Sequence, residues 1–181
     1  MIAALFVAKG GVYYGLPDVD PWDEARDARK YAGPWPVVAH PPCARWSTLA
    51  NIHGRIGEDG GCFEKALECV RKYGGVLEHP AFSMAWEHFG LPKPNRYNVW
   101  QKDIYGCWCA EVSQANYGHE AIKLTWLYAR VPLLPPELCA DVPVAIKSVQ
   151  DDLGKKARAA TPIPFRDLLL SIARSCLPRE S

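Results

Sequence analysis

Two short apolar segments that each run into proline, with one amphipathic helix between them, constrain this chain most. The first segment, residues 36–39, is Pro-Val-Val-Ala and leads into His-Pro-Pro-Cys at 40–43. The second segment, Val-Leu at 76–77, leads into Glu-His-Pro at 78–80. Between them, residues 62–73 carry apolar side chains at helical spacing: Phe63, Ala66, Leu67 and Val70. This order predicts a parallel βαβ unit, whose two strands end at the same edge of one sheet.

Further strands and helices alternate along the rest of the chain. The patterns predict strands at 5–8, 112–116 and 125–129, and helices at 23–31, 82–89 and 165–176. The second and third of these strands are close enough to form a hairpin through residues 117–119. The alternation predicts a single α/β domain over residues 1–181. We expect a Rossmann-like layered fold with a mostly parallel sheet, trimmed in its N-terminal half.

Length, charge and cysteine content exclude several classes of protein. The 181 residues suit one domain, and a net charge of +1 produces no overall field that attracts nucleic acid, so such binding needs a local patch. Seven scattered cysteines without a recognisable export signal predict reduced thiols and a cytoplasmic protein. No segment is apolar over a membrane-spanning length, so we expect no membrane partner. Cys107 and Cys109 are too closely spaced for a structural zinc pair, so we expect no metal.

The two strand ends carry a thiol and a carboxylate that could act on one substrate. Cys43 follows the first strand and Glu78 follows the second, and ligands of open α/β sheets bind at the carboxyl ends of strands. A thiolate suits addition to C6 of a pyrimidine, while the acid hydrogen-bonds or protonates the ring at N3 and C5 becomes able to accept a group. The thiolate needs a positive neighbour, and His40 and Arg45 are the candidates for lowering the pKa of Cys43.

At these residues the chain resembles the cytosine-C5 DNA methyltransferases, particularly the short members carried by bacteriophages. Residues 42–47, Pro-Cys-Ala-Arg-Trp-Ser, are similar to the family's Pro-Cys-Gln-x-aromatic-Ser segment, and residues 78–80 are similar to its Glu-Asn-Pro segment. Residues 113–126 and 158–165 are similar to later segments of the short phage proteins. The resemblance implies that Cys43 is the nucleophile and Glu78 the acid that binds the ring. It further implies substrate contacts from His40, Pro42, Arg45, Ser47, His79, Lys123 and Thr125.

The resemblance also implies a donor and a partner. The partner is DNA or a pyrimidine nucleotide, and the donor is S-adenosylmethionine. The family binds this donor through a glycine-rich Asp/Phe-x-Gly-x-Gly loop and an acid that ends the second strand. Residues 6–12, Phe-Val-Ala-Lys-Gly-Gly-Val, have neither that glycine spacing nor an acid. Asp20, Asp23 and Glu24 are the remaining acids that could hold a ribose.

Two alternatives remain beside a plain methyltransferase. The same cysteine adduct could serve transfer or elimination at the 5-substituent of an already modified pyrimidine, which needs no S-adenosylmethionine. Alternatively, the chain is a non-catalytic nucleic-acid-binding or inhibitor protein on the same scaffold. Titration with S-adenosylmethionine distinguishes a methyltransferase from an enzyme that acts on an already modified pyrimidine. Loss of function in Cys43→Ala distinguishes both enzymes from the non-catalytic protein.

Overall fold

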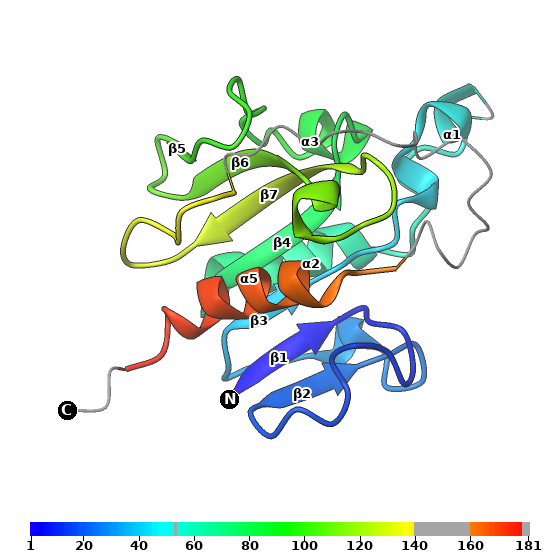
Figure 1. The fold of residues 1–181 in the computed structure, drawn as a ribbon. Helices are drawn as coiled ribbons and strands as arrows, with labels where there is room; N and C mark the ends of the chain where they lie inside the picture. The colour runs from blue at the N-terminus through cyan, green and yellow to red at the C-terminus, as the bar shows by residue number, and fades with distance from the viewer. Residues whose placement is uncertain (53, 140–159, 179–181) are drawn as a thin grey trace.

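A single mixed sheet forms the centre of the protein. The computed structural model describes residues 1–52, 54–139 and 160–178. The strands in these ranges are β1 Ile2–Leu5, β2 Val19–Trp22, β3 Val37–Ala39, β4 Gly75–Pro80, β5 Gln101–Lys102, β6 Trp108–Ser113 and β7 Leu124–Arg130. They pair in the order β2-β1-β3-β4-β7-β6-β5 (Figure 1). The sheet and its helices agree with the predicted α/β class.

The sheet is half parallel and half antiparallel, so the expectation of a mostly parallel sheet is wrong. β2, β1, β3 and β4 pair in parallel, whereas the β4–β7, β7–β6 and β6–β5 pairs are antiparallel. Parallel neighbours need a connection of about a dozen residues or more, usually helical. Only residues 114–123 join β6 to β7, and they include the short 3₁₀ helix η3, Gln114–Tyr117. The chain therefore turns straight back, as the predicted hairpin requires.

The strand–helix–strand unit predicted from the sequence is present. Helix α2, Cys62–Tyr73, has the expected bounds, and the N–H of Gly74 closes its end on the carbonyl of Val70 at 3.0 Å. It connects β3 to β4, which pair in parallel with Ala39 opposite Leu77. Both strands therefore end at the same edge of the sheet.

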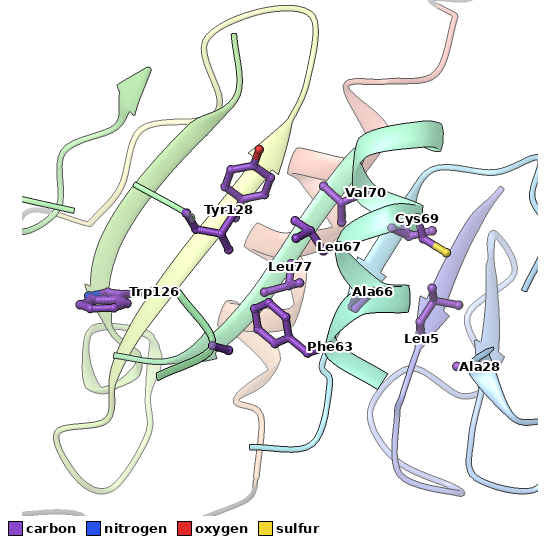
Figure 2. Packing of buried hydrophobic residues seen from close by; sticks show 14 of the residues in the cluster. Leu5, Ala28, Phe63, Ala66, Leu67, Cys69, Val70, Leu77, Trp126 and Tyr128 are labelled. Carbon is purple, nitrogen blue, oxygen red and sulfur yellow. The ribbon is translucent and has the colours of Figure 1, made fainter. Parts of the chain in front are cut away.

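Helices cover both faces of the sheet. Figure 1 shows α5, Ile163–Arg174, in front of the sheet and α2 behind it. The short helix α3, Met84–His88, packs on the α2 face through Trp86. Figure 2 shows the apolar side of α2 against Leu77 and other strand residues. Successive strand residues face opposite layers, so Leu77 belongs to the α2 core and Val76 to the α5 core.

Several N-terminal elements differ from the expected ones. The strand expected at 5–8 lies at Ile2–Leu5, because Phe6 has a φ of 59° that ends the extended conformation. The helix expected at 23–31 is a turn followed by the 3₁₀ helix η1, Ala28–Lys30. The side chains of Asp23 and Asp27 accept hydrogen bonds from nearby backbone N–H groups, and such local bonds compete with a regular helix. The unpredicted β2 contains a proline, which is tolerated because this strand lies at the edge of the sheet.

The later elements shift by a few residues. Ser113 caps η3 with its hydroxyl, so β6 ends there and lies earlier than the predicted 112–116. Ser83 caps α3 in the same way, which shortens the predicted helix at 82–89. The predicted strand at 125–129 lies within β7, and α5 begins two residues before the predicted helix. Residues 132–139, after β7, form no regular helix or strand. In the described part of the chain, no helix is both long and apolar enough to span a membrane.

Candidate active site

His40 and Glu78 meet at the carboxyl ends of β3 and β4. Each follows the paired residues Ala39 and Leu77, so both side chains point to the α5 face of the sheet. Nδ1 of His40 lies 2.9 Å from Oε2 of Glu78. Only about a tenth of either side chain is exposed, at 13% and 10%. The structure thus brings together two residues that the sequence places at separate strand ends.

The second oxygen of Glu78 is held by a residue that the sequence reasoning did not select. Nε2 of Gln114 donates to Oε1 of Glu78 at 3.0 Å and to the hydroxyl of Thr125 at 3.1 Å. The Thr125 hydroxyl in turn donates to the carbonyl of Lys123 at 3.2 Å. Gln114 is only 1% exposed. Its signal in the sequence is its place two residues after the apolar Val112, where the alternation of a strand that continued through 116 would put it on the same face as that residue.

Tyr13 completes this network from the N-terminal half. Its hydroxyl lies 2.8 Å from Nε2 of His40, and the two rings are 5.3 Å apart. Because a carboxylate only accepts hydrogen bonds, Nδ1 of His40 carries the proton that it shares with Glu78. Burial and the charge of Glu78 raise the pKa of Tyr13 well above its usual value, so the phenol stays neutral. No local pattern in the sequence marks Tyr13, because it lies in an irregular turn.

The surroundings of Glu78 keep it ionised. Burial raises the pKa of this carboxyl, but the hydrogen bond and charge of His40, with further positive charge from Lys123, outweigh burial and lower the pKa to about 2. At neutral pH the carboxylate accepts hydrogen bonds and has no proton to give. Of the two roles expected for Glu78, this charge state favours acceptance of a hydrogen bond from the ring over protonation of N3.

Cys43 lies at the surface beside this network. It is exposed and forms the N-cap of the 3₁₀ helix η2, Ala44–Trp46. Desolvation of the thiol and the negative charge of Glu78 raise the pKa of Cys43, while Lys123 lowers it. The expectation of a lowered pKa is therefore wrong. The side-chain charge that opposes the shift comes from Lys123 rather than from His40 or Arg45.

The loop around Cys43 is anchored on both sides. Trp46 is buried, and its indole N–H donates to Oδ2 of Asp59 at 2.8 Å. The Ser47 hydroxyl bonds backbone groups within the turn that leads to α1, Thr48–Ile52, so it acts there as a local cap. Pro42 is exposed and Arg45 is partly buried. These two residues flank the thiol along the chain at the surface.

His79 lies on the opposite face of the sheet from Glu78. Its ring is fully buried and packs 5.1 Å from Phe63 and 6.4 Å from Trp86, measured between ring centroids. Burial lowers the pKa of His79 to about 4, against the opposing effects of Glu78 and the backbone of Pro42. The structure therefore places His79 in the core beneath the Cys43 loop and does not bring it to the Glu78 carboxylate.

Lys123 and Thr125 come from the start of β7. Because β7 is antiparallel to β4, its beginning lies where β4 ends, with Thr125 opposite Pro80. Thr125 is buried within the hydrogen-bond network, and Nζ of Lys123 lies 3.4 Å from the carbonyl oxygen of Ala160. The charge of Lys123 acts on both Cys43 and Glu78. The structure thus joins these two predicted residues to the strand-end site.

A hollow lies beyond the ends of β1 and β2, in the part of the sheet where the resemblance implies that the methyl donor binds. It measures about 400 Å³ and is lined by residues 7–9 and 23–25. Asp20 is already paired with Arg26 at 2.5 Å, and Asp23 accepts a tyrosine hydroxyl at 2.7 Å and a backbone N–H at 3.1 Å. Two of the three acids that could hold a ribose are therefore occupied within the chain.

Among the residues that the structure describes, no group of three or more His, Cys, Asp or Glu side chains is arranged to hold a metal ion.

Comparison of the chain with protein-family models, with curated proteins and with solved structures finds no match.

Proposed function

We propose that this protein modifies a pyrimidine base in DNA by covalent addition of Cys43 to C6, followed by group transfer at C5. The observation that carries the proposal is that three chemical groups come to one edge of the sheet: Cys43 follows the end of β3, Glu78 lies near the end of β4, and Lys123 directly precedes β7. A nucleophile, a hydrogen-bond acceptor and a cation lie there together. Covalent catalysis of this kind divides one difficult substitution into two easier steps.

The proposed reaction is an addition to the C5=C6 double bond followed by an elimination that restores it. A lone pair of the Cys43 thiolate forms the S–C6 bond, and the π electrons of the C5=C6 double bond move onto C5 and the substituent at C4. C5 then binds an electrophile, which is a one-carbon group in transfer or a solvent proton in simple exchange. Loss of the original C5 proton restores the double bond and expels the thiolate. A base within a duplex must first be flipped out of the stack, which costs a few kcal/mol.

The ionised Glu78 supports the binding half of this reaction. Its carboxylate is fixed by His40 and Gln114, so it presents an oriented acceptor to the ring. Lys123 favours the thiolate form of Cys43, and its positive charge stabilises the negative charge that forms on the adduct. These three contributions come from the chain itself and require no cofactor.

Residues 6–12 have neither the glycine spacing nor the acid of the family's donor loop, which favours transfer or elimination at an existing 5-substituent, a reaction that needs no S-adenosylmethionine. The proposed setting is the cytoplasm of a bacterial host that carries a phage gene. The parallel half of the sheet runs β2-β1-β3-β4, which differs from the 3-2-1-4 strand order of a Rossmann fold, so strand order does not support the Rossmann-like description.

Exchange of the C5 proton tests the proposal without a donor. Single-stranded oligonucleotides with one deoxyuridine or one deoxycytidine are incubated with the protein in D₂O, and deuterium at C5 is measured by mass spectrometry. We expect exchange with the native protein and none with Cys43→Ser, because an unactivated hydroxyl is a weak nucleophile. Glu78→Gln should slow it by about 10²–10⁴-fold.

The control variant is Cys62→Ala, which removes a partly buried thiol at the start of α2. It should exchange at the native rate. If neither base exchanges while the protein still binds DNA, the covalent mechanism fails, and the non-catalytic binding protein becomes the better description.

A further inference from the structure

Phe82 adopts a backbone conformation that is unfavourable for its residue type. Its φ is 63°, in the left-handed region where a bulky side chain is an outlier. Hydrogen bonds fix the chain on both sides of it. The N–H of Ala81 donates to the carbonyl of Leu124 at 2.9 Å, and the N–H of Ser83 donates to the carbonyl of Pro80 at 3.3 Å. Glycine adopts this conformation without strain, so the turn itself does not require a phenylalanine.

The side chain of Phe82 is mostly exposed rather than packed. The residue is 71% exposed, and its ring centroid lies 5.3 Å from that of the buried Trp126. Such a residue lowers stability twice, through backbone strain and through apolar surface left in water. Strained residues of this kind cluster at functional sites, where a contact outweighs the loss of stability. The ring of Phe82 therefore points to a contact with a molecule outside the chain.

Phe82 lies at the same edge of the sheet as Cys43. It follows the end of β4, and Cys43 follows the end of β3, which is parallel to β4. A series of neighbouring aromatic rings connects the two positions, with centroid separations between 5.3 and 5.9 Å. In order, these rings are Phe82, Trp126, Trp86, Phe63 and Trp46. Trp46 belongs to the 3₁₀ helix η2 that Cys43 caps. Phe82 is therefore the exposed end of an aromatic series that reaches the Cys43 loop.

The loop after Cys43 carries two arginines. Arg45 is partly buried and Arg55 is exposed, and neither forms an ion pair with any residue that the structure describes. Guanidinium groups bind phosphates through charge-assisted hydrogen bonds. Basic side chains beside exposed aromatic rings are the combination by which proteins hold single-stranded nucleic acid, because every base has a π face that can stack.

We propose that Phe82 is a stacking platform for an unpaired base of a DNA strand whose phosphates contact the loop after Cys43. The proposal rests on the function proposed above and names the form of its substrate, a single strand with an unpaired base beside the target pyrimidine. Stacking on an aromatic ring strengthens binding of the strand and takes no part in bond formation.

A short single-stranded oligonucleotide with 2-aminopurine beside one deoxyuridine tests this role. The fluorescence of 2-aminopurine falls when the base stacks on an aromatic ring. We expect the native protein to quench it, and we expect Phe82→Gly to lose the quench and to bind the strand about five- to a hundredfold more weakly. Phe82→Trp keeps a flat aromatic ring, so it should quench and bind within about threefold of the native protein.

Tyr105→Ala is the matched control. Its ring is 78% exposed but lies in the turn between β5 and β6, at the opposite edge of the sheet, so this variant should bind and quench as the native protein does. Because glycine relieves the strain at position 82, the urea midpoint of Phe82→Gly should be no lower than that of the native protein. A lower midpoint would assign the ring to packing on Trp126 and overturn the proposal.

The outcomes separate the stacking role from the proposed function. Native-strength binding or an unchanged quench in Phe82→Gly overturns the stacking role alone, and C5 exchange by the native protein then still supports the covalent mechanism. Weak binding by Phe82→Trp also overturns it, because a platform tolerates another flat ring. If the native protein binds no single strand and exchanges no C5 proton, the stacking role and the proposed function fail together.

Discussion

At the scale of single residues, Cys43 combines surface exposure with a raised pKa. Of the seven cysteines, Cys43 is exposed, Cys69, Cys107 and Cys109 are buried, and the others are partly buried. Exposure therefore favours reaction at this thiol, while desolvation and Glu78 oppose formation of the thiolate. The reactive form increases with pH, and the positive charge of Lys123 acts against the two effects that raise the pKa of Cys43.

We predict that limiting iodoacetamide alkylates Cys43 before the other cysteines, as read by peptide mapping. Lys123→Met should raise the pKa of Cys43 further and slow its alkylation at pH 8 by roughly two- to fivefold. Lys102→Met, on the edge strand β5, removes the same charge from a different part of the sheet and should leave the rate unchanged. Earlier reaction of Cys62 or Cys69 would show that the site assignment is wrong.

His79 makes the stability of the fold depend on pH. The pKa of its ring is about 4 in the folded protein, below its usual value of 6.5. Between these values the unfolded chain binds more protons than the folded one, so acidification favours unfolding. The contribution is complete above pH 6.5 and is lost as the pH falls toward 4.

We predict that the free energy of unfolding of the native protein falls between pH 6.5 and 4, with a slope from His79 that approaches about 1.4 kcal/mol per pH unit. His79→Leu should remove this contribution, as measured by urea unfolding at several pH values. His88→Leu is the matched control, because this exposed histidine lies on α3 outside the core, and it should keep the native slope. An unchanged slope in His79→Leu would contradict the assignment.

At the scale of elements, the approach of β3 to β4 depends on one glycine. Gly75 begins β4 with a φ of 111°, and a Cβ there would overlap the backbone of Val37 in β3. Any side chain at this position must therefore force the two strands apart. These are the strands whose ends carry the candidate site, so their spacing also sets the distance between His40 and Glu78.

We predict that Gly75→Ala lowers the free energy of unfolding by about 3 kcal/mol or more, because backbone strain and an unrelieved clash add together. Gly15→Ala is the control, since Gly15 also has a positive φ of 79° but open space around it. It should cost only about 1 kcal/mol. Equal losses in urea unfolding of the two variants would show that the strand contact is not the cause.

At the scale of the whole molecule, the mixed sheet assembles the site. In the parallel half, β3 and β4 end at one edge and bring His40 and Glu78 there. Because β7 runs the other way, its start reaches the same edge with Thr125. β6 is antiparallel to β7, so its end delivers Gln114 to that edge as well. The antiparallel half therefore supplies the groups that orient Glu78.

Patterns within short segments were enough to predict the centre of this fold. The periodicity of residues 62–73 predicts α2 with its observed bounds, since an amphipathic helix is defined by spacing along its own sequence. The strands on either side follow from apolar runs that end at proline. Their parallel pairing follows from the length of the connection, which explains why the ends of these two strands, with Cys43 and Glu78, could be predicted to lie at one edge.

Tertiary structure alone decided that the predicted hairpin joins the sheet antiparallel to β4, and it alone decided the charge state of the site. Strand pairing joins residues far apart in the chain, so local patterns did not reveal that β4 pairs with β7 rather than with a parallel neighbour. The ionisation of Glu78 depends on His40 and Lys123, which reach it only after the sheet has formed. Tyr13 and Gln114 could not be selected from the sequence for the same reason, because they reach His40 and Glu78 only in the folded sheet. Electrostatic effects follow distance in space, and the sequence specifies that distance only through the complete fold.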